Sequence, residues 1–255
     1  GSASNRGKVQ VYRGDVTIAL DVAHRLISIS GTTGTTGRFG AAVATAGDVD
    51  GDGVSDLALA APDQDTWGVV KIFHGTPDVI STTPSWSIIG STNYEDQGMS
   101  LATAGDVNGD GYADVLVSNR GGLGSAGEVR MYLGGPTGLS ATAAWTKTGE
   151  HVDDRFGQCV ASAGDVNGDG YSDVLVGAPS FQRAGDPVGT WRGKVYLYLG
   201  SASGLATTPV WTMEGEAAEA RLGAGLASAG DVNGDGYSDV ILGAYTYGGS
   251  GKAYV

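Results

Sequence analysis

Four short stretches of this sequence combine alternating oxygen-bearing side chains with glycines. They begin at Asp48 (DVDGDGVSD), Asp106 (DVNGDGYAD), Asp165 (DVNGDGYSD) and Asp231 (DVNGDGYSD). Each has Asp or Asn at positions 1, 3, 5 and 9 and glycine at positions 4 and 6. The glycines permit the positive φ that bends a backbone so that alternate oxygens converge on one point. Ligands that are all oxygen select a hard cation, and a crowded, flexible set favours calcium over magnesium.

The four stretches therefore predict about four structural calcium ions. Side chains at positions 1, 3, 5 and 9 and the backbone carbonyl of position 7 are the expected ligands. A single stretch of this kind is also typical of a solvated turn, but four copies with the same spacing strongly favour metal binding. The predicted ligands are Asp48, Asp50, Asp52, Val54 and Asp56; Asp106, Asn108, Asp110, Tyr112 and Asp114; Asp165, Asn167, Asp169, Tyr171 and Asp173; and Asp231, Asn233, Asp235, Tyr237 and Asp239.

An EF-hand does not fit these loops. An EF-hand requires an acidic residue at position 12 and an exiting helix. Position 12 is apolar in every copy, being Leu59, Val117, Val176 or Leu242. The residues after position 9 form short apolar runs typical of strands, so each loop should close on its own Asp at position 9 and lead into a strand.

Composition bounds the class of protein. A chain of 255 residues can bury a substantial core in one or two domains, and 45 glycines predict many short strands and turns. The formal net charge of −13 argues against a nucleic-acid partner. However, 13 of the 28 acidic residues lie in the four loops, and four calcium ions would bring the charge to about −5. No long apolar segment is present, so direct membrane insertion is not expected.

The loops recur at intervals of 58, 59 and 66 residues, which is typical of one supersecondary unit per repeat. Each unit is predicted to contain strand A, the calcium loop, and strands B, C and D, with small residues in A and tryptophan at the start of D. This pattern predicts an all-β propeller of four-stranded antiparallel blades in a single domain. Full blades are expected at 38–90, 97–149 and 155–215, a last blade lacking strand D at 221–255, and a partial blade with strands C and D at 7–31.

The two ends of the chain leave alternatives open. Residues 1–6 are interpreted as a flexible cloning remnant. Strand D of the partial blade, 25–31, could complete the last blade and so remove exposed sheet edges. Alternatively, the chain is a fragment of a larger ring.

Two segments carry a family resemblance. RFGAAVATAGDVDGDGVSDLALAAP (38–62) and RFGQCVASAGDVNGDGYSDVLVGAP (155–179) resemble FG-GAP repeats, the blades of the integrin α-subunit head and of many bacterial surface proteins. The resemblance implies seven blades as the usual number and a location outside the cytoplasm. It departs from the family pattern at Gly98-Met99 and Leu222-Gly223, where FG is expected.

The loops opposite the calcium loops are the expected partner face. They differ between repeats and carry aromatic and charged residues on a rigid scaffold, which is typical of a recognition surface. In integrins the ligand also binds opposite the calcium loops. A protein or glycan ligand is expected there, with blade capping as the alternative role of these residues. The candidates are Trp67, Tyr94, His151, Phe181, Arg183, Trp191, Arg192, Tyr245 and Tyr247.

Enzymatic activity is not expected from this sequence. The three histidines show no metal-binding spacing, and no nucleophile elbow is present. His151 near Asp153 and Asp154 is the one constellation with acid–base potential. The predicted function is a calcium-stabilised binding or adhesion module; a lectin, or an accessory propeller of an extracellular hydrolase or lyase, is the alternative.

Overall fold

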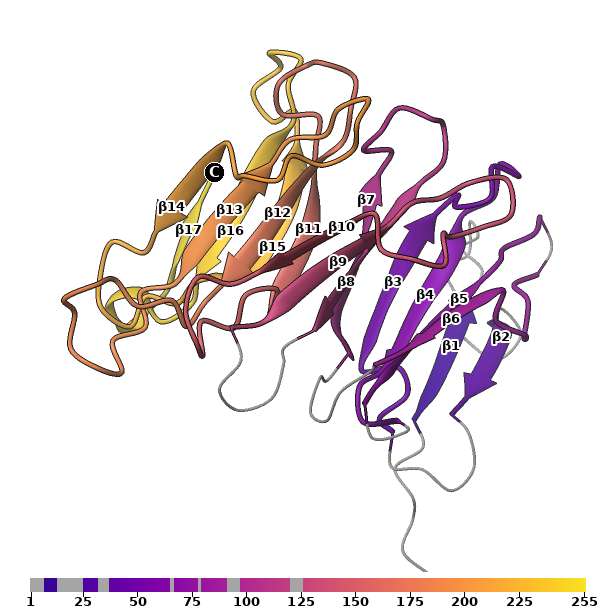
Figure 1. Cartoon of the computed structure of the whole chain (residues 1–255), viewed down its shortest axis with the longest axis horizontal. Helices are drawn as coiled ribbons and strands as arrows, with labels where there is room; N and C mark the ends of the chain where they lie inside the picture. The colour runs from indigo at the N-terminus through magenta and orange to yellow at the C-terminus, as the bar shows by residue number, and fades with distance from the viewer. Residues whose placement is uncertain are drawn as a thin grey trace, which may run out of the picture.

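The computed structural model describes residues 7–12, 25–31, 37–64, 67–77, 79–90, 97–119 and 126–255, and their regular secondary structure is almost entirely β-strand (Figure 1). In this part of the chain, no helix has the length and apolar character required to cross a membrane. The chain is therefore all-β, as the sequence predicts.

Three four-stranded antiparallel sheets form the centre of the molecule, and each follows the predicted order A, B, C, D. We call them blades 1, 2 and 3. Blade 1 comprises β3 (Ala42–Gly47), β4 (Asp56–Ala61), β5 (Val69–Phe73) and β6 (Trp86–Ile89). Blade 2 comprises β7 (Gln97–Gly105), β8 (Asp114–Asn119), β9 (Glu128–Tyr132) and β10 (Trp145–Thr148). Blade 3 comprises β11 (Cys159–Gly164), β12 (Asp173–Ala178), β13 (Lys194–Tyr198) and β14 (Trp211–Glu214).

Smaller sheets lie at the two ends. Blade 4 has three strands, β15 (Leu222–Gly230), β16 (Asp239–Ala244) and β17 (Lys252–Tyr254), with the short 3-10 helix η3 (Tyr247–Gly249) before β17. At the N-terminal end, β1 (Lys8–Tyr12) pairs with β2 (Arg25–Ser30) in a separate two-stranded sheet. The suggestion that 25–31 completes the last blade is therefore wrong: Ile29 and its neighbours pack on Phe39 and Leu59 of the first repeat instead.

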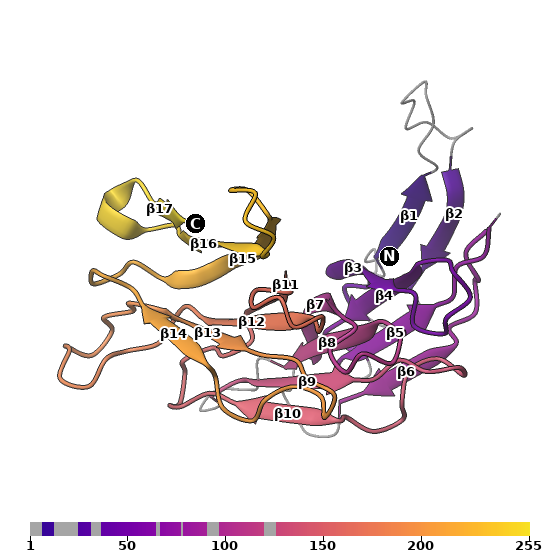
Figure 2. The same ribbon diagram turned by 90° about the horizontal axis from the view of Figure 1, so that it is seen from above.

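The sheets follow one another along an open arc. Figure 2 shows β1 and β2 at one end of this arc and β15 to β17 at the other. The described residues form blades of the propeller type but do not close a ring, so a closed propeller stays a prediction.

The core lies between neighbouring blades, with strand B at its centre. All six residues of β8 and all six of β12 are buried, because a sheet lies against each of their faces. Near-continuous apolar runs are what strands covered on both faces require. The acidic loops connect strands A and B, so each loop is anchored to the strand at the centre of the core.

The strand D tryptophans join one blade to the next. The Trp86 ring meets Tyr132 of blade 2 edge-on at 4.9 Å, and Trp145 meets Tyr198 of blade 3 at 5.0 Å. Their indole nitrogens donate to backbone carbonyls of the following blade, at Ser140 (3.1 Å) and Ala206 (3.0 Å). Inter-blade packing rather than sugar stacking therefore accounts for these two side chains. Trp211, at the start of strand D of blade 3, is 42% exposed.

Candidate calcium loops and a cleft on the opposite face

The four acidic segments adopt one shared loop conformation. We call residues 48–56, 106–114, 165–173 and 231–239 loops 1 to 4. In loop 3, Asp165 Oδ1 accepts hydrogen bonds from the backbone amides of Gly168 (2.7 Å) and Asp169 (3.2 Å), and its Oδ2 accepts from Gly170 (2.8 Å). The equivalent bonds recur in the other three loops. The glycines at positions 4 and 6 have positive φ in every loop, as the predicted turn requires.

The Asp at position 9 closes each loop and begins strand B, as predicted. In loop 3, Asp173 Oδ2 accepts from the Val166 amide at 2.9 Å, and Oδ1 accepts from the amide of Gly200 in the C–D loop at 2.9 Å. Asp56 and Asp114 make the same pair of bonds in loops 1 and 2. These three carboxylates are at most 3% exposed.

Burial and neighbouring carboxylates work against ionisation of position 9. Burial first, and then the charges of Asp110 and Asp106, raise the pKa of Asp114 to about 6, against the opposing effect of two backbone N–H donors. The pKa values of Asp56 and Asp173 are raised for the same principal reason. A buried carboxylate facing two others is stable as an anion only beside a cation.

This donor set fits calcium. Carboxylate oxygens of Asp48, Asp50 and Asp56 lie within 4.8 Å of one another. Every side chain predicted to bind the metal in the four loops is Asp or Asn, which would ligate it through oxygen. Calcium binds six to eight oxygens with flexible geometry. In loop 1, the positions predicted to bind the ion through side chains are Asp48, Asp50, Asp52 and Asp56, and the ion would neutralise the charge that position 9 places against the core. Ligation by the carbonyl of position 7 stays a prediction.

The carboxyl of Asp114 should titrate near pH 6 in calcium-free protein. Because its folded-state pKa lies above the unfolded value of 3.8, this group lowers stability as pH rises from about 4 through 6. At neutral pH the loss is about 3 kcal/mol. Saturating calcium should lower this pKa below its ordinary value. Carbonyl-detected NMR titration of ¹³C-labelled aspartate measures the pKa of Asp114 without calcium and with saturating calcium. An ordinary pKa in calcium-free protein would contradict this account.

Hydrogen bonds connect the loops of successive blades, which the sequence did not indicate. The amide at position 8 donates to the position 1 carbonyl of the preceding loop, from Ala113 to Asp48 at 2.8 Å and from Ser172 to Asp106 at 2.9 Å. The third link joins Ser238 to Asp165 at 2.9 Å. The loops therefore form a chain along one face of the molecule.

Tyrosine at position 7 strengthens this chain. A Cβ placed on Gly51 would lie 2.6 Å from the ring of Tyr112, so the ring packs over the glycine of the preceding loop. The rings of Tyr171 and Tyr237 pack on the preceding loops in the same way. Glycine at position 4 therefore serves two purposes, the turn itself and the close approach of the next blade.

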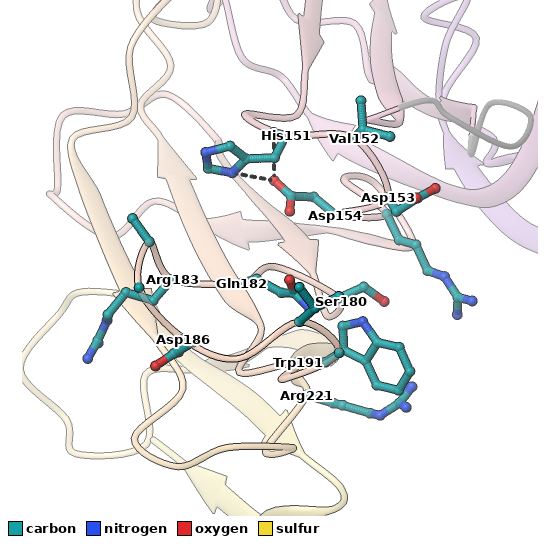
Figure 3. A pocket seen from close by; sticks show the side chains of 15 residues that line it. His151, Val152, Asp153, Asp154, Ser180, Gln182, Arg183, Asp186, Trp191 and Arg221 are labelled. Atoms are coloured by element: carbon teal, nitrogen blue, oxygen red, sulfur yellow. Dashed lines mark hydrogen bonds and ion pairs between the residues drawn. The ribbon is translucent and has the colours of Figure 1, made fainter.

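An open cleft of about 800 Å³ lies beside blade 3, on the face opposite loops 1 to 4. The D–A loop from His151 to Arg155 and the B–C loop from Ser180 to Trp191 form its walls, together with Arg221 from the loop before blade 4. Figure 3 shows His151 and Asp154 on one side and Trp191 beside Arg221 on the other.

The His151–Asp154 pair supports the loop that carries it. Asp154 is 2% exposed, and its Oδ2 accepts from the His151 amide at 2.8 Å and lies 3.3 Å from His151 Nδ1. Burial raises the pKa of Asp154 despite these contacts. The carboxyl therefore holds a tight turn, and the acid–base role considered from the sequence has no further geometric support.

The cleft gathers only part of the predicted partner face. His151, Arg183 and Trp191 line it, whereas Trp67 and Tyr245 are exposed elsewhere on loops, and Tyr94 lies outside the described residues. The prediction that Phe181 belongs to the partner face is wrong. Its side chain is 4% exposed and packs in the core, with Lys194 and His151 against its ring. Arg192 is held by Asp186, with Nη2 3.2 Å from Oδ1, and Tyr247 packs against the core of blade 4.

Two arginines of the cleft were missed by sequence reasoning. Arg155 and Arg221 line it, and both have positive φ, 57° and 53°. A signal was available, since arginine stands at the same place in three repeats, as Arg38, Arg155 and Arg221, one residue before Phe39, Phe156 and Leu222.

Antiparallel four-stranded sheets, each with an acidic nonapeptide between strands A and B, define a protein built from propeller-type blades. Comparison with known families agrees. The FG-GAP-like repeat matches residues 48–117 and 106–176, and the FG-GAP repeat matches 160–198 and 223–255. The chain belongs to the FG-GAP repeat family.

Curated relatives include integrin α subunits. The chain is 32% identical over 212 residues to integrin alpha-V of Gallus gallus, covering 78% of this chain and 19% of the relative. It is 33% identical over 228 residues to integrin alpha-PS2 of Drosophila melanogaster, covering 78% and 15%. The chain thus spans a fifth or less of the length of these two relatives. Among solved structures, a rhamnogalacturonan lyase of Bacillus licheniformis aligns with a TM-score of 0.46 and 19% identity, over 77% of this chain and 38% of the lyase.

Proposed function

We propose that this chain is a calcium-stabilised binding module of the adhesion type, which recognises a protein partner through the loops opposite the calcium loops. The contrast between the two faces carries this proposal. On the calcium side, the C–D loops support loops 1 to 3, and those of blades 2 and 3 consist largely of Gly, Ser, Thr and Ala. On the other side, loops of unequal length hold His151, Trp191 and several arginines around a cleft.

Calcium has a structural role in this proposal. Each ion would neutralise the acids of one loop and so maintain the contacts between consecutive loops. Extracellular modules of this kind bind calcium at about 10⁻⁴–10⁻³ M. Such sites fill outside the cytosol, which supports a location at the cell surface, in the periplasm or in the extracellular medium.

Glycan binding is the second candidate, because Trp67 is 36% exposed and Trp191 lies at the cleft. An accessory role beside a hydrolase or lyase domain is the third. We infer binding rather than catalysis for this chain, since His151 and Asp154 have a sufficient structural role.

Adhesion of cells to beads that carry this chain tests the function. Adhesion should require calcium and should fall severalfold for His151→Ala combined with Tyr245→Ala on the proposed face. Ser203→Ala, on the calcium side, is the matched control and should change nothing. Protease treatment of the cells should abolish adhesion. Adhesion that resists protease but is lost after glycosidase treatment would favour the glycan candidate, and absence of adhesion to every cell type tried would refute the proposal.

A further inference from the structure

Three arginines occupy equivalent positions in blades 1, 3 and 4. Arg38, Arg155 and Arg221 each precede strand A, and all three adopt left-handed backbone conformations, with φ of 46°, 57° and 53°. Non-glycine residues adopt this region at an energetic cost, and such conformations concentrate at functional sites. In three of the four blades, the loop before strand A therefore places an arginine on the face opposite the calcium loops.

The three arginines differ in their partners. Arg38 forms a bidentate ion pair with Asp63, in which Nη2 lies 2.7 Å from Oδ1 and Nε contacts the other oxygen. Ser180 and Thr246 stand at the position of Asp63 in blades 3 and 4. Because these two side chains carry no charge, they cannot pair with arginine as Asp63 does. Neither Arg155 nor Arg221 has an ion pair among the described residues.

The other charged groups of the cleft are largely satisfied. Asp186 is paired with Arg192, and Arg183 Nε is 2.6 Å from Glu214 Oε2. Asp154 is buried beneath His151, which leaves Asp153 as the exposed acid of the lining. Two guanidinium groups therefore face the cleft without a carboxylate partner, in a chain whose net charge is −13.

Arg221 is also held in position. Its guanidinium carbon lies 4.3 Å from the centroid of the Trp191 ring, and Figure 3 shows the two side chains together. Stacking on an aromatic ring leaves the N–H donors of a guanidinium free for a carboxylate. It also covers one face of Trp191, which reduces the area available for a sugar ring.

We propose that this cleft binds an acidic peptide segment, with its carboxylates accepting hydrogen bonds from Arg155 and Arg221. The inference rests on the proposed protein-binding function and adds the chemistry of the partner. Arginine and carboxylate form bidentate, charge-assisted pairs, which are the strong hydrogen bonds of recognition sites. The covered face of Trp191 favours a peptide carboxylate over an acidic saccharide.

NMR titration of the whole chain in millimolar calcium tests this proposal. The probe is a capped pentaglutamate peptide, with capped pentaglutamine as the uncharged reference. Pentaglutamate should shift the indole N–H signal of Trp191, and pentaglutamine should not. Arg155→Gln and Arg221→Gln should each raise the dissociation constant at least tenfold. Arg38→Gln is the matched control because it removes the same charge from an equivalent position whose arginine is already paired.

Each other outcome would overturn the proposal. Equal weakening by all three variants would indicate a general charge effect, and pentaglutamate without effect on Trp191 would place binding elsewhere. Binding of pentagalacturonate but not of pentaglutamate would assign the site to an acidic glycan. If the peptide fails to bind while cells still adhere through protein, this inference fails and the proposed function stands. Absence of cell adhesion refutes the proposed function itself.

Discussion

Removal of calcium should lower the melting temperature of this protein by more than about 10 °C. A ligand that binds only the folded state stabilises it in proportion to the logarithm of its concentration over Kd. With Kd of about 10⁻⁴–10⁻³ M and calcium near 10 mM, each loop contributes roughly 1.4 to 2.7 kcal/mol. Four loops together contribute about 6 kcal/mol or more, and 1 kcal/mol corresponds to about 2–4 °C for a chain of this size.

The chain of loops is the reason to expect so large an effect. The carbonyls at position 1 of loops 1, 2 and 3 accept hydrogen bonds from the next blade, so repulsion within one emptied loop weakens an interface as well as a turn. Loop 4 donates to loop 3 through the amide of Ser238.

Thermal unfolding in excess chelator and in excess calcium measures this effect. Calcium added after chelation should restore the transition. Magnesium is the control and should restore less, because it requires six nearly octahedral ligands and retains its water. Identical melting temperatures in chelator and in calcium would count decisively against structural calcium.

The second large effect is expected at Gly47, where two blades come into close contact. A Cβ on Gly47 would lie 2.4 Å from Cβ of Ala113 in blade 2, and φ is 78°. Gly47→Ala must therefore separate the two blades or shift the loop. Overpacking of this kind costs about 1–3 kcal/mol, in addition to about 1–2 kcal/mol for the left-handed backbone.

Gly230 supplies the matched control for Gly47. It stands at the same bulge before loop 4, has φ of 68°, and has no atom within 4 Å of an added Cβ. Gly230→Ala should therefore incur the backbone cost alone. Chemical denaturation of both variants isolates the inter-blade term as the difference between them. Equal destabilisation would show that the contact between loops 1 and 2 contributes nothing.

Most of the blade architecture could be predicted because the loops fix the register. The Asp at position 9 begins strand B in all four repeats, and the small residues before position 1 form strand A. Tryptophan likewise marked strand D, since Trp86 and Trp145 fill equivalent places between blades. Local periodicity carried these assignments, as repeat proteins allow.

Contacts between repeats were not predictable from the pattern within one repeat. The hydrogen bond from Ala113 to Asp48 joins residues far apart in the sequence, and so does the stacking of Arg221 on Trp191. Phe181 was misassigned because an aromatic residue in a variable loop can turn inward when a neighbour such as Lys194 covers it. The strand pattern predicted β1 and β2 as strands C and D of a partial blade, but it did not specify that this pair packs on the first repeat instead of completing blade 4.

Counting bound ions tests the central claim most directly. Equilibrium dialysis against calcium, with the metal quantified per chain, should give about four ions. Each of the four acidic loops carries one set of oxygen ligands and should therefore bind one ion. Asp169→Asn preserves the side-chain oxygen that accepts from the Tyr171 amide but removes one charge, and should reduce the count by one. A wild-type chain that retains no calcium at millimolar concentration would contradict the account.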